Sequence, residues 1–501
     1  MHMLMRKEEP EIYTMQQALL DAGASQQYAA PFSGVALPYR LRQDQLIGLK
    51  KMIKMKRFGL FPEARTGKTI IFAIACIYFA HHGVKSIILS PPVLFLQLEE
   101  QFASITGKEA KVATLNGLPK TRAERIAQWN LNPADTPHIL IMTKEIFKLE
   151  ILKLLRLGYT NLVYDEAHMG LQSEKSQTYA AVQYFCSKAA NARFTPSTGT
   201  PIPNEIINAY PIISLVNPSA YLSRAQFDRK HVIYAQQRFG RRTVVVNVGY
   251  KDISRVHSAL YANAHRVTKA EVLGLGAPHI QVLPVRLSKS HQGLYRRLMT
   301  TRVLEHRGQT INAVQAQALR QIALQMITTP HDFGAVKDNA VLDLVQELLQ
   351  DVGAATKEKV VLFANYNRSV ETLRDTLSAY DPAVVYGPGR NNAQEAERFK
   401  KDPKCRVLIA NPVAGGVGLT LGGVSSTAIF VEPVSTPGQF DQACSRIMLA
   451  GQTEPVSVYI FKVMGTISPR AIELMLRKGD EIKQVNKDPT TLLDELLGGE
   501  K

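Results

Sequence analysis

The sequence predicts an α/β protein with two parallel sheets, because short apolar runs alternate with helical stretches in two separate series. One run, NLVYDEAH at 161–168, passes from apolar residues directly into Asp165 and Glu166. A buried parallel strand of this kind delivers carboxylates to the sheet edge where ligands bind. Two carboxylates there suit a magnesium nucleotide, one holding the metal and the other polarising a water. The alternative is a strand followed by an acidic helix cap.

The first series predicts one sheet within residues 36–218. Besides the acid-ended run, its buried strands are expected at 86–92, 138–143 and 192–201. Ahead of them, apolar residues at helical spacing in 37–55 predict a helix. Gln45 lies on that helix, either as a functional residue or as a surface glutamine.

The second series predicts another parallel sheet within residues 336–470. Its strands are expected at 359–365, 383–387, 406–412, 426–433 and 456–463. The remaining segments are expected to be a peripheral lead-in, a helical and locally basic segment between the sheets, and a C-terminal helical tail: 1–35, 219–335 and 471–501. The basic pairs of the middle segment are either a solvated face or a nucleic-acid contact.

Composition favours a polyanionic partner. The chain has 60 basic and 43 acidic residues and a net charge of +17, and nucleic acid is the commonest such partner. The four cysteines form no CxxC pair, so neither a zinc site nor a disulfide scaffold is indicated. The longest apolar run, Ile70 to Ala80, is too short to span a bilayer, and the N-terminus shows no signal-peptide core. A cytoplasmic protein without a membrane partner is expected.

A second candidate for phosphate binding is the turn Arg65–Thr69, which precedes a strongly apolar helix. Such a turn points backbone N–H groups and a helix N-terminus at a phosphate. Lys68 would reach the β- and γ-phosphates, and the Thr69 hydroxyl would bind Mg²⁺. Pro62 occupies the place of the first glycine in the strict pattern GxxxxGK[ST], so the turn gains its weight from its position ahead of the acid-ended strand.

Six motifs follow one another in a characteristic order. They are LRQDQLIGL (41–49), EARTGKT (63–69), DEAH (165–168), STGTPIPN (197–204), AGGVGLTL (414–421) and DQACSRIMLAGQTEPVSVYIF (441–461). In this order and spacing they resemble the SWI/SNF-type DNA-dependent ATPases of helicase superfamily 2, over about 37–470. The resemblance implies two RecA-like lobes that bind ATP and Mg²⁺, and the compact chain is similar to bacterial or phage members that would act in a bacterial cell or infected host.

The resemblance also implies roles for single residues. The catalytic set is Lys68, Asp165, Glu166 and Arg446, with Thr69 and Asp165 on Mg²⁺. Nucleotide contacts are implied for Gln45, Arg65, Thr66, Gly67, Lys68, Thr69, Gly416, Gly418 and Gln442. Coupling is implied for His168, Ser197 and Thr198, for which strand capping is the plainer interpretation. DNA contacts are implied for Pro92, Thr143, Thr200, Asn365, Ala414 and Gly415, and a tight turn is the plainer interpretation of the glycines.

Two positions depart from the family pattern. Arg65 stands where the phosphate loop usually has glycine, which adds a cation there. Leu449 stands where the pattern QAxxRxxRxGQ has its second arginine, the arginine finger. Arginine fingers are worth roughly a thousandfold or more in turnover. Three interpretations are open: Arg446 alone makes the γ-phosphate contact, another arginine substitutes for the missing one, or the protein is a slow ATPase.

Three functions are compatible with these features. The first is an ATP-dependent translocase that moves along double-stranded DNA by contacting phosphates, independently of sequence. The second is a strand-separating or branch-migrating helicase, for which the sequence shows no convincing wedge. The third is a nucleotide-gated DNA-binding scaffold with little turnover, an interpretation that Leu449 supports.

Overall fold

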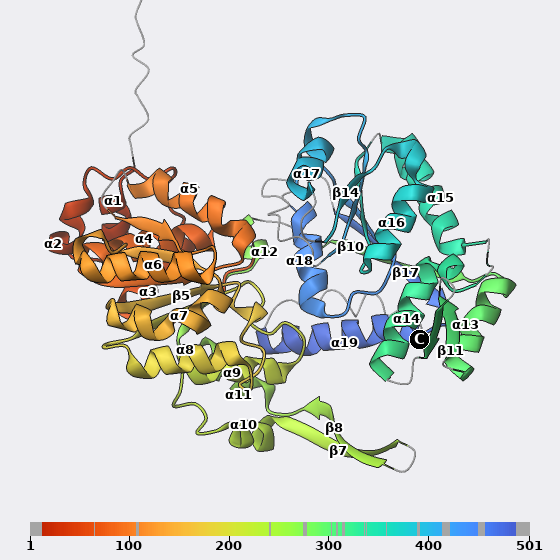
Figure 1. The fold of residues 1–501 in the computed structure, drawn as a ribbon, viewed down its shortest axis with the longest axis horizontal. Helices are drawn as coiled ribbons and strands as arrows, with labels where there is room; N and C mark the ends of the chain where they lie inside the picture. The colour runs from red at the N-terminus through yellow and green to blue at the C-terminus, as the bar shows by residue number, and fades with distance from the viewer. Residues whose placement is uncertain are drawn as a thin grey trace, which may run out of the picture. The chain divides into compact units, whose positions relative to one another are not determined.

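The computed structural model describes residues 13–64, 66–106, 110–239, 242–273, 278–301, 303–306, 309–312, 316–334, 336, 338–356, 358–387, 391–412, 421–448 and 456–486. The chain divides into two compact units (Figure 1). The first unit comprises Met1–Pro201 and Ile207–Val272, and the second comprises Ile202–Ile206 and Leu273–Lys501.

A parallel sheet forms the centre of the first unit. Its seven strands, as found among the described residues, have the order β3-β4-β2-β5-β6-β1-β9. Their bounds are β1 Gly59–Leu60, β2 Lys85–Leu89, β3 Val112–Thr114, β4 Ile139–Met142, β5 Tyr159–Asp165, β6 Arg193–Ser197 and β9 Ala264–His265. The four strands expected from apolar runs are confirmed as β2, β4, β5 and β6. The strands that sequence analysis missed have two or three residues, too few to show a pattern.

Helices pack around this sheet. They are α1 Met15–Asp21, α2 Gln26–Ala29, α3 Gln43–Lys54, α4 Lys68–His81, α5 Phe95–Thr106, α6 Pro119–Leu131, α7 Lys144–Arg156, α8 Gln177–Lys188, α9 Ala209–Val216, α10 Arg224–His231, α11 Ile253–Tyr261 and α12 Lys269–Leu273. The expected helix in 37–55 is confirmed as α3. α4 is buried around almost its whole circumference, as its continuous apolar sequence requires, and it packs against α3, α5 and the sheet.

Residues 219–335 are not the helical segment that the sequence predicted. They include an antiparallel pair, β7 Val232–Phe239 and β8 Arg242–Tyr250, and a second pair, β11 Val303–His306 and β12 Gln309–Asn312. The β-branched run at the centre of β8 favours a strand over a helix. The prediction is therefore corrected to a mixture of helices and strand pairs.

A second parallel sheet forms the centre of the second unit. Its six strands, counted over the described residues, have the order β10-β17-β16-β13-β15-β14. Their bounds are β10 His279–Arg286, β13 Val360–Phe363, β14 Ala383–Val385, β15 Val407–Ala410, β16 Thr427–Phe430 and β17 Ser457–Met464. All five strands of the predicted second series are confirmed. β10 was missed, and Pro284 within it is tolerated because β10 is an edge strand.

Both faces of this second sheet are covered. The helices are α13 Lys289–Thr301, α14 Ala316–Thr328, α15 Ala340–Thr356, α16 Asn367–Thr376, α17 Asn392–Lys401, α18 Pro437–Ile447 and α19 Ser468–Asn486. Along β13, Val360 and Leu362 belong to one apolar cluster, while Val361 and Phe363 belong to another. A strand buried on both faces must be apolar at every position, which explains its continuous run.

A buried carboxylate, Glu432, follows β16 in the second unit. Its side chain is 1% exposed, and one oxygen accepts hydrogen bonds from the hydroxyls of Thr328, at 2.8 Å, and Ser369. The other oxygen accepts the backbone N–H of Asn365 at 2.8 Å. Burial raises the pKa of Glu432 to about 7, although these hydrogen bonds oppose the shift.

Glu432 should make the unfolding of the second unit depend on pH. Because its pKa is higher in the folded state, its contribution to stability falls as pH rises from about 4.5 through 7, by up to roughly 3 kcal/mol. Glu432→Gln removes this titration and costs the Asn365 hydrogen bond at all pH values. The thermal midpoint of the variant relative to wild type should therefore improve between pH 5 and pH 8. A difference in midpoint that stays constant over this range would contradict the expectation.

Candidate functional site

The turn before α4 has the geometry of an anion site. Gly67 is the N-cap residue of α4, and its φ of +87° lies in the left-handed region that glycine adopts without strain. A Cβ atom there would lie 2.2 Å from the side-chain nitrogen of Gln45. Lys68 and Thr69 are the first residues of α4, so backbone N–H groups and two polar side chains share one helix N-terminus.

Gln45 fastens α3 to this turn. Its side chain is 1% exposed, so the alternative of a surface glutamine is wrong. Oε1 accepts the Arg42 backbone N–H at 3.0 Å, which closes a capping box on α3, and Nε2 donates to the Thr66 carbonyl at 3.4 Å. The Arg42 guanidinium donates to the same carbonyl. A nucleotide contact of Gln45 stays a prediction. The side chain that would make this contact already donates a hydrogen bond to the loop before α4.

The Lys68 side chain is hydrogen-bonded to the backbone of the loop before α4. Its Nζ donates to the Glu63 carbonyl oxygen at 3.2 Å, and the Thr66 hydroxyl donates to the same oxygen at 2.7 Å. The Glu63 carboxylate in turn accepts the Lys269 backbone N–H at 3.0 Å and lies 3.4 Å from the Arg266 guanidinium. The loop is thus shaped by hydrogen bonds to its own backbone and by residues more than two hundred positions away.

The two neighbouring acids lie in different environments. Asp165 ends β5, is 6% exposed and accepts the Ser197 hydroxyl at 3.3 Å. Burial, with the charge of Glu166 as a second cause, raises the pKa of Asp165 to about 7 although the Lys68 ammonium and the Ser197 hydrogen bond lower it. Glu166 has a φ of +50°, uncommon for a residue other than glycine, and its side chain is 30% exposed.

A hydrogen-bond network joins the end of β5 to the end of β6. His168 Nδ1 lies 2.9 Å from the Thr198 hydroxyl and 3.3 Å from Glu166 Oε2. The Thr198 hydroxyl accepts the Thr200 backbone N–H at 3.1 Å. Local capping therefore accounts for the hydrogen bond between Thr198 and the Thr200 backbone. His168, which lies close to both Thr198 and Glu166, links the two residues.

Gly199, between Thr198 and Thr200, was not predicted as a site residue. A Cβ atom there would lie 2.8 Å from the backbone nitrogen of Ala64. The turn after β6 therefore packs directly on the loop before α4, in a space that admits only glycine. The sequence signal for this position was the glycine between two threonines in STGT. That tetrapeptide alone does not reveal the contact with Ala64, which lies more than a hundred residues earlier.

The four described residues predicted to contact DNA differ in their exposure and in the hydrogen bonds they make. Pro92 is exposed at the start of a short 3₁₀ turn, Pro92–Leu94. The Thr143 hydroxyl caps α7 by accepting the Ile146 N–H at 3.2 Å, and the Thr200 hydroxyl is buried. In the second unit, the Asn365 side chain donates to the Pro433 carbonyl at 2.5 Å. Only Pro92 among these four is exposed, whereas Thr143 and Asn365 use polar atoms to hold their own backbone.

Part of the predicted set belongs to the second unit. Gln442 and Arg446 are half-buried on α18, whose last turn carries Arg446. The Arg446 carbonyl accepts the Leu421 N–H at 2.8 Å. The predictions for Arg65, Ala414, Gly415, Gly416, Gly418 and Leu449 lie outside the described residues.

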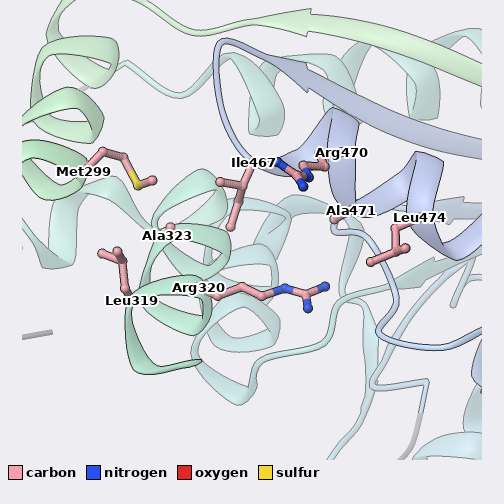
Figure 2. A pocket seen from close by; sticks show the side chains of 8 residues that line it. All are labelled: Met299, Leu319, Arg320, Ala323, Ile467, Arg470, Ala471 and Leu474. Atoms are coloured by element: carbon pink, nitrogen blue, oxygen red, sulfur yellow. The ribbon is translucent and has the colours of Figure 1, made fainter. Parts of the chain in front are cut away.

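The second unit also holds a cavity of about 290 Å³ between α13, α14 and α19 (Figure 2). Its lining is mostly apolar, with two arginines: Met299, Leu319, Arg320, Ala323, Ile467, Arg470, Ala471 and Leu474. None of the residues predicted to bind nucleotide or DNA lines it, so this cavity is separate from the candidate site. No described helix is both long and apolar enough to cross a bilayer.

Comparison with known proteins decides the family. A model of the SNF2-related domain matches residues 12–331, which include the loop before α4, both acids and the turn after β6. The chain belongs to the SNF2-related family. The resemblance inferred from the motifs is thus confirmed, and the two parallel sheets of this SNF2-related protein are its two RecA-like lobes.

Its relatives are longer proteins. An uncharacterized ATP-dependent helicase of Mycoplasma genitalium is 24% identical over 469 residues, covering 89% of this chain and 42% of the relative. A RAD54-like DNA repair and recombination protein of Drosophila ananassae is 22% identical over 437 residues, covering 79% of this chain and 54% of the relative. This SNF2-related chain thus spans about half the length of the curated relatives it matches.

A solved structure is also similar. It is the SWI2/SNF2 ATPase core of Sulfolobus solfataricus in complex with dsDNA, with a TM-score of 0.40 and 16% identity over 91% of this chain and 95% of that one. At this TM-score the match adds no detail to the fold described above.

Proposed function

We propose that this protein is an ATP-dependent translocase on duplex DNA. One observation carries the proposal most directly. In a chain of the SNF2-related family, the N-terminus of α4 presents Lys68 close enough to Asp165 to lower its pKa, next to a second carboxylate on Glu166. A cation, a helix N-terminus and two acids at one sheet edge are the groups that nucleotide hydrolysis needs.

The same residues fit Mg²⁺. Asp165 is a buried carboxylate whose pKa is raised to about 7, and a divalent cation beside it would hold it ionised. Mg²⁺ takes oxygen ligands, commonly one or two protein groups with water and substrate phosphates. We assign Asp165 and Thr69 to the ion, which when bound would neutralise charge on the phosphates.

The protein groups then take separate tasks. Lys68 exchanges the Glu63 carbonyl for the β- and γ-phosphates, while the backbone at Gly67 and Lys68 holds phosphate oxygens. Glu166 orients the attacking water and accepts its proton. His168 holds the Glu166 carboxylate and, through Thr198, links its position to the turn after β6. A γ-phosphate contact by Arg446, on α18 of the second unit, stays a prediction from the motif pattern.

DNA as the polyanion is supported by the net charge of +17 and by relatives whose names refer to helicases or to DNA repair. Contacts to phosphates carry no sequence information and release counterions, so binding should be independent of sequence and weaken steeply with salt. A strand-separating helicase is the second candidate, because the structure contains the antiparallel pair β7–β8 that the sequence did not predict.

The deciding experiment is steady-state ATP hydrolysis at low salt without DNA, with single-stranded DNA and with duplex DNA, using Glu166→Gln as the blank. Stimulation mainly by duplex, together with ATP-dependent displacement of a triplex-forming strand, supports the translocase. Stimulation by single strands with unwinding of a forked duplex supports the helicase. A rate equal to the blank while nucleotide still binds overturns both motor functions and leaves the nucleotide-gated scaffold.

A further inference from the structure

The strands β7 and β8 form an arm that the proposed chemistry does not use. This arm, called the ribbon below, consists of Val232–Phe239 and Arg242–Tyr250 paired antiparallel. It extends away from α10 and α11, outside the layers of the first sheet (Figure 1). In the described chain neither strand pairs with a third one, so both edges of the ribbon are open.

The base of the ribbon is firmly built. His231, fully buried just before β7, lies 2.8 Å from the Tyr221 hydroxyl through Nε2 and 3.3 Å from the Lys251 carbonyl through Nδ1. Burial lowers the pKa of His231, so the ring is neutral and donates to the carbonyl while accepting from the hydroxyl. On α10, Arg224 pairs with Glu174 and Asp228, both at 2.6 Å. The ribbon is therefore held at its root on both strands.

Beyond this base both faces of the ribbon are exposed. Tyr234, Val245 and Arg238 lie on one face, and Val245 is 60% exposed. On the other face, Gln237 and Val244 are paired and both exposed. A two-stranded ribbon is marginally stable alone, and open edges with exposed apolar side chains invite a partner. The first unit covers the root of the ribbon, and the side chains named here are exposed beyond it.

Charge identifies the partner. From 229 to 251 the sequence contains no Asp or Glu, although acids make up 43 of the 501 residues. Arg238 and Arg242 belong to the ribbon strands, and Arg229, Lys230, Arg241 and Lys251 lie next to them in the sequence. Exposed amides and a hydroxyl on Gln236, Gln237 and Thr243 add neutral hydrogen-bonding groups. An arm whose charged residues are all basic, with these neutral groups beside them, fits the phosphates of a nucleic acid.

The shape favours a duplex over a single strand. Single strands are bound by stacking bases on aromatic rings. Among the ribbon side chains that the structure describes, the exposed aromatic one is Tyr234, which lies near the root and makes a side-chain hydrogen bond with Asp228. By contrast, a two-stranded ribbon, with strands about 4.8 Å apart, enters the major groove of B-DNA, which is about 12 Å wide. The eight residues of β7 extend about 26 Å, enough to follow the groove past several base pairs.

We propose that the ribbon lies in the major groove of duplex DNA and that Arg238 contacts phosphate there. The inference deepens the proposed function, from which it takes DNA as the polyanion. The exposed valines contact the groove floor without reading a sequence, and the amides of Gln236 and Gln237 reach backbone or base edges. The ribbon thus adds an arm for holding the duplex, apart from the residues that handle ATP.

The test measures binding of a fluorescent 30-base-pair duplex without nucleotide, between 50 and 200 mM salt. Arg238→Gln should weaken binding severalfold and reduce the salt slope by about one unit. A second variant replaces 233–249 by Gly-Gly, a closure that is possible because Val232 and Tyr250 are directly paired. It should weaken binding roughly tenfold or more, as expected from the loss of several contacts. Arg156→Gln, an exposed arginine at the end of α7, serves as the matched control and should bind normally.

Hydrolysis in the absence of DNA should be unchanged in all three variants, which shows that each one folds. Unchanged duplex affinity in the Gly-Gly variant overturns the ribbon inference. So does a variant that binds duplex normally but no longer unwinds a fork, because the ribbon would then be a strand-separating pin. If wild type shows duplex-stimulated hydrolysis while ribbon variants bind normally, the ribbon inference fails alone. If the ribbon governs duplex binding but DNA never stimulates hydrolysis, the translocase fails alone.

Discussion

Replacing Lys68 by alanine should lower ATP hydrolysis by roughly a thousandfold or more, because the variant loses a cation at the transferring phosphoryl group. A second effect adds to this loss. The Lys68 ammonium lowers the pKa of Asp165, although burial still raises that pKa to about 7. Without Lys68 this carboxyl is more fully protonated at neutral pH and becomes a poorer ligand for Mg²⁺. Nucleotide affinity, measured by fluorescence of a labelled ATP analogue in the presence of Mg²⁺, should therefore fall together with turnover.

Lys85→Ala is the matched control for that variant. The Lys85 ammonium also donates to a backbone carbonyl, that of Leu157 at 2.9 Å, but it lies at the first residue of β2, on the opposite edge of the sheet. Its loss costs a similar hydrogen bond without touching the phosphate loop. If Lys68→Ala hydrolyses ATP at the rate of Lys85→Ala, the assignment of the loop before α4 to phosphate binding is wrong.

The buried strands were predictable because their physics is local. Val360 to Phe363 of β13 face two apolar clusters alternately, so the run must be apolar throughout and must end where the backbone leaves the core. β1 contains only Gly59 and Leu60, and its place between β6 and β9 is set by partners distant in sequence. The ribbon escaped prediction for another reason. Neither of its faces is buried, so selection for an alternating pattern is absent from β7 and β8.

The candidate site likewise contains features that were predictable from local sequence and features that were not. Asp165 and Glu166 were predictable because they follow a buried strand, and Lys68 because it begins a helix after a glycine turn. The left-handed backbone of Glu166, the packing of Gly199 on Ala64 and the contact between Gln45 and Gly67 were not, since each depends on segments brought together by the fold. Thr143 shows the limit of motif reasoning, because the same hydroxyl satisfies a helix N-cap and a family pattern.

Glu166→Gln should bind ATP as wild type does and hydrolyse it roughly 10²- to 10⁴-fold more slowly, the usual effect of removing a general base. The amide keeps the length of the side chain, so the left-handed turn at 166 should be retained. It can still accept a hydrogen bond from His168, but it cannot take a proton from water. Single-turnover hydrolysis should show the loss in the chemical step, while the affinity for the labelled ATP analogue should stay within about twofold of wild type.

Asp165→Asn separates this role from that of its neighbour. Asp165 is buried and bonded to Ser197, and its proposed role is on the metal, so its amide variant should lose Mg²⁺-dependent affinity as well as turnover. Glu166 is more exposed and linked to His168, and its variant should lose turnover alone. Each substitution replaces a carboxylate by an amide of the same size, so the pair compares the two environments that the fold supplies. Equal losses of affinity in both variants would show that the division of labour between the two carboxylates is wrong.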